Sequence, residues 1–245
     1  MALEFTRTIG DGYPDYVEDE LGYNYHAWEV ISASESKAYE ELQRADSTQL
    51  ENLAQQFRPL SDLLRWALAR RHLRLGQRAK YFEVTELIVD GDFDHPALHY
   101  PEILADLARR RAEDGNLDEA RSRLEHIESK WPEFKEAIPL LDAQLLLLAG
   151  RHQEAHHAFD EALSPYEEDV DLRIETADDF QRAGAFDHAK TWLQRARVLA
   201  LSLDDSASLV DIDLMEQSLG ADEAMPTEED PGEENPGELS DGTEA

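Results

Sequence analysis

A short pattern that begins with glycine and ends with alanine occurs three times in the chain. Its copies are GNLDEA from Gly115, GRHQEA from Gly150 and GAFDHA from Gly184. The glycines are 35 and then 34 residues apart. A repeat of this length is one supersecondary unit that cannot bury its apolar face alone, so neighbouring copies must stack. The spacing therefore predicts an array of similar units.

Each glycine follows apolar residues spaced by three and four positions, which is the pattern of an amphipathic helix. Because glycine adopts the left-handed conformation without strain, we expect it to terminate each helix. A second helical pattern follows, with a small residue where two helices cross closely. These small residues are Ala120, Ala155 and Ala189. Pro132 ends the first unit and Pro165 nearly ends the second, because proline is excluded from helix interiors.

The order of small residue, turn glycine, second-helix alanine and exit proline resembles the tetratricopeptide repeat. The resemblance implies an all-α fold, a right-handed superhelix of antiparallel helix pairs. It places three units at residues 101–135, 136–169 and 170–203. The chain departs from the family where a large aromatic residue is expected early in the first helix. The residues found there are Leu104, Pro139 and Arg173.

Residues 58–100 are interpreted as a degenerate helix pair with an inserted loop around Gly91 to Pro101. Gly76 stands at its turn, and Tyr81 falls where the other units have a small residue. The loop is expected because the next turn glycine comes 39 residues after Gly76. This unit precedes the three repeats in residues 101–203.

The ends of the chain differ from the repeats. Residues 1–57 are predicted to form an arm and a helical cap, with one or two helices from Ser34 to Phe57. Residues 204–219 are predicted to form a closing helix that covers the last repeat. Residues 220–245 carry ten acidic and no basic side chains. Since too few apolar groups remain to offset the entropy of ordering, we expect a disordered acidic tail.

Aromatic residues concentrate in the N-terminal arm. They are Tyr13, Tyr16, Tyr23, Tyr25 and Trp28. Exposed aromatics in such number lower solubility, which favours an arm packed on the first helices. A short motif that binds another protein is the alternative.

The chain has 23 basic and 55 acidic side chains, a formal net charge of −32. This balance argues against binding to nucleic acid or an anionic membrane, because both need basic residues that neutralise phosphate. Cysteine is absent, which removes disulfides and thiolate sites. With no secretory signal or long apolar run, we expect a cytoplasmic protein. The acidity suits a salt-rich, halophilic host or, equally, a GC-rich genome.

The segment from Arg58 to Lys80 is basic, although the chain as a whole is acidic. It has seven basic residues, and its single acid is Asp62. Three of its residues share one helix face, since they are spaced by four. They are Trp66, Arg70 and Arg74. With Arg109 from the next unit, this face would border a groove that grips an acidic peptide or a terminal carboxylate. The alternative is that the arginines pair with surrounding carboxylates.

Some tetratricopeptide-repeat proteins bind the C-terminal carboxylate of a chaperone through Lys and Asn side chains on successive first helices. The equivalent helix faces here carry Arg109, Gln144 and Asp178, so we do not predict that ligand. The face around Gln144 is otherwise apolar, which favours a hydrophobic or helical ligand, with core packing as the alternative.

Four of the nine histidines form two pairs spaced by four positions, and one of these pairs shares a helix face with an acidic residue. This face carries His152, His156 and Asp160, and the second pair is His95 and His99. A zinc site needs three or four ligands and a second shell, so we interpret these histidines as packed or solvated and predict no metal site.

No phosphate-binding glycine loop, nucleophile elbow or zinc helix is found, so no catalytic residue is predicted. We expect a non-catalytic scaffold without a cofactor, which binds a peptide or helix of another protein in a concave groove. The expected binding residues are Trp66, Arg70, Arg74, Arg109 and Gln144. A structural subunit of a larger or self-associated assembly is one alternative. A regulator or enzyme whose active part lies in the N-terminal region, near His26 or His99, is another. The oligomeric state is left open.

Overall fold

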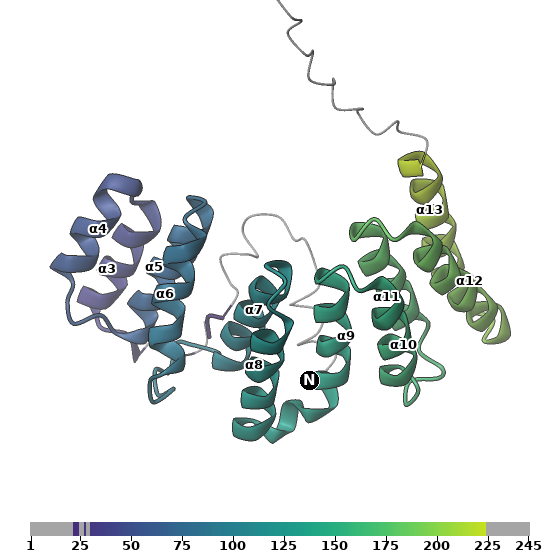
Figure 1. Cartoon of the computed structure of the whole chain (residues 1–245), viewed down its shortest axis with the longest axis horizontal. Helices are drawn as coiled ribbons and strands as arrows, with labels where there is room; N and C mark the ends of the chain where they lie inside the picture. Colours follow the sequence, from purple (N-terminus) through teal and green to yellow (C-terminus); the bar gives the residue numbers. More distant parts are fainter. Residues whose placement is uncertain (1–21, 25–26, 28–29, 224–245) are drawn as a thin grey trace, which may run out of the picture. The chain divides into compact units, whose positions relative to one another are not determined.

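The computed structural model describes residues 22–24, 27 and 30–223, with side chains described as far as residue 220. Within these residues eleven α-helices and a short 3₁₀ helix follow one another and no β-strand forms, which confirms the all-α class (Figure 1). The helices are α3 (Ala33–Arg44), α4 (Ser47–Gln56), α5 (Asp62–Arg74), α6 (Arg78–Val89), α7 (Tyr100–Glu113), α8 (Leu117–Lys130), η2 (Pro132–Ala137), α9 (Ile138–Leu148), α10 (His152–Ala162), α11 (Val170–Arg182), α12 (Phe186–Ser202) and α13 (Ser206–Glu223).

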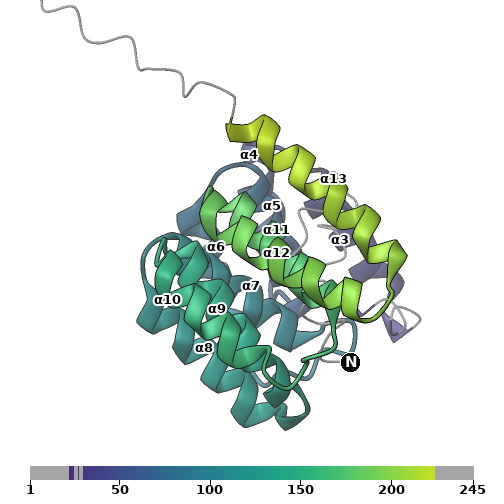
Figure 2. The same ribbon diagram turned by 90° about the vertical axis from the view of Figure 1, so that its right-hand side faces the viewer.

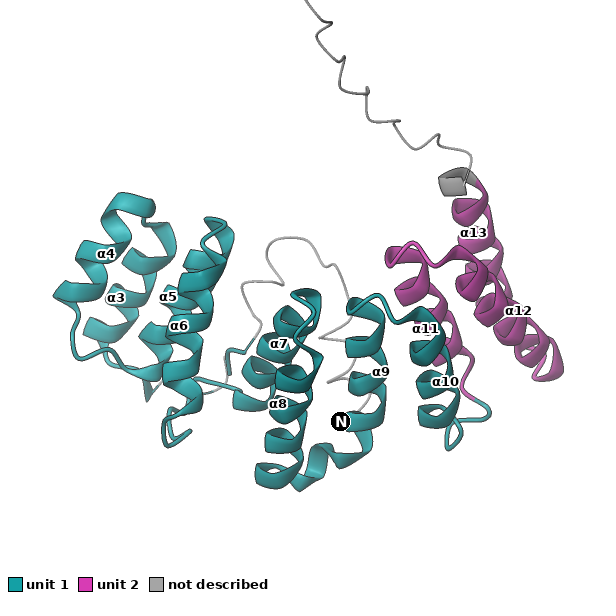
Figure 3. Cartoon of the chain, in the orientation of Figure 1, with its two compact units in different colours: residues 1–168 teal, residues 169–245 magenta. Residues whose placement is uncertain are grey.

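Helices that are consecutive in sequence pack as pairs. In the first part of the chain these pairs are α5 with α6, α7 with α8 and α9 with α10. In the last part α11 packs with α12, and α13 lies along α12 and also contacts α11, as Figure 2 shows. The chain divides into two compact units, residues 1–168 and residues 169–245 (Figure 3). Unit 1 thus holds α3 to α10, and unit 2 holds α11 to α13.

The turn inside every pair is built in the same way. The turn glycines have positive φ angles of 70°, 78°, 73° and 71° at Gly76, Gly115, Gly150 and Gly184. After each glycine the next backbone N–H donates to the carbonyl five residues earlier, at 2.8 or 2.9 Å. This 6→1 bond satisfies a carbonyl at the helix end that has no partner within the helix. The predicted helix terminations are confirmed, including the one in the degenerate pair.

The residue five positions after each glycine is fully buried. Ala120, Ala155 and Ala189 are all 0% exposed, which confirms the predicted close crossing. In the degenerate pair this place is taken by Tyr81, which is also 0% exposed. A phenol in so closed a place requires both extra space and a hydrogen-bond partner.

Prolines follow the second helix of two pairs. Pro132 stands two residues after the end of α8 and begins the 3₁₀ helix η2. Pro165 lies in the connection after α10. Both positions agree with the predicted exclusion of proline from helix interiors. The inserted loop occupies residues 90–99 between α6 and α7, close to the predicted Gly91 to Pro101, and Pro101 itself lies in the first turn of α7.

The N-terminal cap consists of α3 and α4, as predicted. The side chain of Ser32 accepts a hydrogen bond from the Glu35 N–H at the start of α3, and Asp46 with Gln49 forms a capping box at α4. Both helices pack on α5 through a buried aliphatic cluster. Of the arm aromatics only Tyr23 lies within the described residues. It forms an isolated antiparallel bridge with Leu98 and is 6% exposed, so the arm packs on the helices at this point.

The predicted closing helix exists as α13, which continues four residues beyond Leu219. Ser208, Ile212 and Leu219 are its buried residues. Residues 224–245 of the predicted acidic tail lie outside the described part of the chain.

Candidate functional site

The segment that is basic in sequence lies in α5 and at the start of α6. In α5, Trp66 is fully buried and Arg70 is only 2% exposed. The reason is that α3, α4 and α6 all pack against α5, so nine of its thirteen residues are buried. The face shared by Trp66 and Arg70 therefore points into the interior of unit 1. This finding corrects the prediction that these two residues line an open groove.

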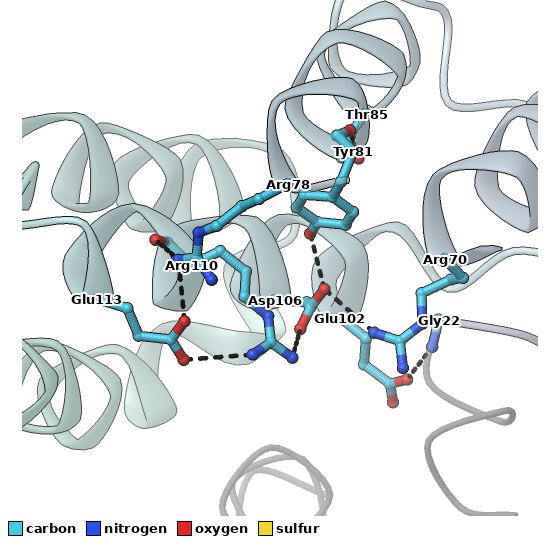
Figure 4. Close-up of polar contacts among 9 residues, drawn as sticks. All are labelled: Gly22, Arg70, Arg78, Tyr81, Thr85, Glu102, Asp106, Arg110 and Glu113. Atoms are coloured by element: carbon cyan, nitrogen blue, oxygen red, sulfur yellow. Dashed lines mark hydrogen bonds and ion pairs between the residues drawn. The ribbon is translucent and has the colours of Figure 1, made fainter. Parts of the chain in front are cut away.

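Arg70 lies beside a buried carboxylate. Its Nη1 is 3.4 Å from Oδ2 of Asp106, an α7 residue with 0% exposure. Tyr81 of α6 donates a hydrogen bond of 2.7 Å to the same oxygen. Nη2 of Arg110 is 3.4 Å from the other carboxylate oxygen. Figure 4 shows these three side chains converging on the carboxylate. We call Arg70, Tyr81, Asp106 and Arg110 the Asp106 cluster.

The cluster holds two arginines against one carboxylate, and Arg110 also pairs with Glu113 outside the cluster, at 3.3 Å. Burial by itself would raise the pKa of the Asp106 carboxyl, but the charges of Arg70, Arg110 and Arg109 outweigh it. Together with the hydrogen bond from Tyr81, they hold this pKa below its usual value. Burial, and then the neighbouring carboxylate, raises the pKa of Tyr81 well above that of a free tyrosine. At neutral pH the phenol therefore donates and the carboxylate accepts, an arrangement suited to holding three helices together.

Most other basic residues of segment 58–80 are also engaged within unit 1. Arg65 pairs with Asp62 at 2.8 Å, and Lys80 pairs with Glu51. Arg78 of α6 reaches α7, with 2.9 Å to both Glu113 and Asp114. Counting Arg70, at least four of the seven basic residues pair with carboxylates of the described residues. The structure thus supports the alternative in which the local positive charge balances nearby acids.

The other three predicted binding residues lie on different helices. Arg74 is exposed at the end of α5, and its Nη1 donates a hydrogen bond of 2.9 Å to Oε1 of Gln43 in α3. Arg109 in α7 and Gln144 in α9 are half-buried. Of the five predicted residues, Arg74 is therefore the only one whose side chain is mostly open to solvent.

The N-terminal arm is fastened to α7 by a glutamate. Oε2 of Glu102 accepts a hydrogen bond of 3.0 Å from the Gly22 N–H, and its Oε1 lies 3.1 Å from Nδ1 of His99. Gly22 has a φ of 77°, and a Cβ atom there would lie 2.7 Å from the Ile103 side chain and 2.8 Å from Trp66 Nε1. Only glycine fits this approach. His99 thus has a structural partner, and His26 lies outside the described residues.

Histidines do not gather with acids into a metal site within the described part of the chain. His156 is 8% exposed and lies 3.7 Å from Asp160, while His152 is half-buried. His95 lies 3.4 Å from Glu35. These positions agree with packed histidines.

Sequence reasoning missed Asp106 and did not give Tyr81 a role. A signal for Asp106 exists, because it is the single acid within the apolar run ILADLA of residues 103–108. Buried charges are normally paired, so such an acid predicts a nearby cation. The identity of that cation follows only from the tertiary structure, which brings Arg70 of α5 to 3.4 Å from Asp106 of α7.

Comparison of the chain with protein-family models, with curated proteins and with solved structures yields no match. Among the described helices, none has the combination of length and apolarity that crossing a membrane requires.

Proposed function

We propose that the chain is a tetratricopeptide-like helical-repeat protein that binds another protein and has no catalysis of its own. Four helix pairs share one turn geometry and one crossing position, which supports the repeat assignment. The proposal includes a right-handed superhelical stacking of the pairs and a cytoplasmic location. Helical repeats of this kind present extended surfaces on which partners bind.

The observation that carries the binding proposal is a concentration of exposed apolar side chains in unit 2. Eight large hydrophobic residues of the described chain are exposed, and five of them lie between residues 198 and 214. They are Val198, Leu201, Leu203, Val210 and Leu214, with exposed fractions between 45% and 65%. We call them the α12–α13 apolar surface. Apolar side chains exposed in such number on one helix hairpin mark an interaction site.

The preferred occupant is an amphipathic helix of a partner protein with basic residues at its edges. Val198 and Leu201 are three positions apart on α12, and Val210 and Leu214 are four apart on α13, so each pair shares a helix face. Asp211 is exposed on the same hairpin. A chain with a net charge of −32 also attracts basic partners over distance. A basic partner replaces the acidic peptide expected from the sequence, because Trp66 and Arg70 are buried.

The proposal is tested by affinity capture from the native host, followed by measurement of the dissociation constant for the captured partner. Val210→Glu with Leu214→Glu places two charges on the α12–α13 apolar surface and is expected to weaken binding by at least about tenfold, since it removes two apolar contacts. The matched control is Val30→Glu with Leu87→Glu, which changes two exposed apolar residues elsewhere. Equal binding by both variants and wild type would refute the proposal.

A structural subunit is the second candidate, because a second copy of the chain could cover the same apolar surface. Sedimentation velocity over a range of concentrations separates the two. A dimer that Val210→Glu with Leu214→Glu converts to monomer would favour self-association. A monomer at every concentration would favour a different partner.

A further inference from the structure

A hollow of about 590 Å³ lies between α9 and α10 of unit 1. The two helices pack side by side (Figure 3). The apolar part of its lining consists of Pro139, Ala158, Ala162, Pro165 and Tyr166. Its acidic part consists of Glu136, Asp142 and Glu161. We call this feature the α9–α10 hollow.

The hollow exists because the side chains that face it are small. Pro139 in the first turn of α9 is exposed, Ala158 is half-buried and Ala162 is buried. None of the three reaches across the space between the helices. The volume lies within the range of about 300–1,000 Å³ that is usual for small-molecule sites, so it is ample for one long side chain.

The charge of the hollow is negative and only partly neutralised. No Lys or Arg belongs to its lining. Asp142 is neutralised from outside by Arg121, whose Nε and Nη2 donate to its two oxygens at 2.6 and 2.9 Å. Glu136 and Glu161 are exposed, and within the described part of the chain neither has a hydrogen-bond or ion-pair partner.

Two acids that lie between other helices of unit 1 are, in contrast, paired with arginines. Glu86 is bound by Arg111 at 3.0 Å and by Arg123 at 2.7 Å. Glu113 is bound by Arg78 at 2.9 Å and by Arg110 at 3.3 Å. Each of these two acids is thus neutralised by two arginines, at least one of them from a neighbouring helix. At Glu136 and Glu161 the chain supplies none.

We propose that the α9–α10 hollow binds an arginine side chain from a peptide segment of a partner protein. Guanidinium is planar and weakly hydrated, so it can stack on the ring of Tyr166 while it donates to Glu136 and Glu161. The methylene stem packs on Pro139 and Ala158. This site goes beyond the proposed function, because it lies on unit 1 and selects one type of side chain.

The experiment is a titration of the isotope-labelled full chain with the peptide Ac-Leu-Arg-Leu-NH₂, followed by NMR. The expected result is a saturable shift of the Ala158 and Ala162 methyl signals and of the Tyr166 ring. The same peptide with citrulline in place of arginine keeps the shape and removes the charge, and it is expected to bind at least about tenfold more weakly, as lost charge-assisted bonds predict. Equal binding of both peptides, or shifts confined to other residues, would overturn the proposal.

Two double variants test whether Glu136 and Glu161 bind the arginine of the peptide. Glu136→Gln with Glu161→Gln is expected to weaken binding of the arginine peptide about three- to tenfold, the usual range for two exposed charges. The control is Glu125→Gln with Glu133→Gln, which changes net charge equally at exposed positions outside the hollow. Equal weakening by both variants would show attraction to net charge alone and refute the site.

The outcome is independent of the proposal for unit 2. Val210→Glu with Leu214→Glu is expected to leave binding of the arginine peptide unchanged. Loss of peptide binding in that variant would also contradict the hollow as the site.

Discussion

Replacement of Asp106 by asparagine tests whether the buried arginine of α5 is held by charge. Asp106→Asn keeps the shape of the side chain and removes its charge, while Arg70 stays 2% exposed and 3.4 Å away. Breaking a buried ion pair at one partner costs about 3–5 kcal/mol. Arg110 is 22% exposed and keeps its pair with Glu113, so its lost contact with Asp106 adds little to this cost. We therefore expect the free energy of unfolding to fall by about 3 kcal/mol.

The assay is urea unfolding followed by tryptophan fluorescence and circular dichroism. In a thermal unfolding experiment, the same loss of about 3 kcal/mol would lower the melting temperature by roughly 6–12 °C for a chain of this size. Asp142→Asn is the matched control, because its partner Arg121 is 40% exposed and a surface pair contributes at most about 1 kcal/mol. The triple variant Arg70→Met, Tyr81→Phe and Asp106→Leu removes both charges together with the hydroxyl that would lose its acceptor, and it is expected to recover most of the loss. An Asp106→Asn variant no less stable than Asp142→Asn would refute the reasoning.

Three further predictions concern the same contacts and the repeat turns. Tyr81→Phe removes the hydroxyl that donates to Asp106 at 2.7 Å, and we expect a loss of about 1–2 kcal/mol in urea unfolding; an unchanged midpoint would contradict it. The low pKa of Asp106 stabilises the fold above the unfolded carboxyl pKa of about 3.9, and this contribution is lost as pH falls through the folded value. The stability gap between wild type and Asp106→Asn should therefore be largest above about pH 5 and narrow below about pH 4, whereas a constant gap would be inconsistent with an ionised Asp106. Gly150→Ala forces alanine to a φ of 73°, and an added Cβ atom there would have no neighbour within 4 Å. We therefore expect backbone strain alone to lower the free energy of unfolding by about 1–2 kcal/mol. The control Gly220→Ala, inside α13, is expected to cause no such loss.

The sequence predicts the helix pairs well because their signals are local. A glycine at the end of an apolar helical pattern determines its own left-handed turn, and Ala155 five residues later meets the preceding helix whatever lies further away. The same rule applies to Gly76. These features depend on neighbours within one pair, so spacing alone is enough to predict them.

The orientation of the basic helix could not be predicted in this way. Spacing by four shows that Trp66, Arg70 and Arg74 share a face, but it does not show which elements cover that face. Packing of α5 against α3, α4 and α6 buries the first two and leaves Arg74 exposed. The partner of Arg70 lies 36 residues later in sequence. Local sequence patterns do not predict the α9–α10 hollow either, because it forms between small residues of two different helices.

The most direct test of the account compares two surfaces in one capture experiment with the native host extract. Val210→Glu with Leu214→Glu alters the α12–α13 apolar surface, and Arg74→Glu with Arg109→Glu alters the two arginines of the predicted groove that are not fully buried. If the α12–α13 apolar surface binds the partner, the first variant loses the partner and the second retains it, while circular dichroism shows that both are folded. Loss of the partner by the arginine variant, with retention by the apolar one, would contradict it.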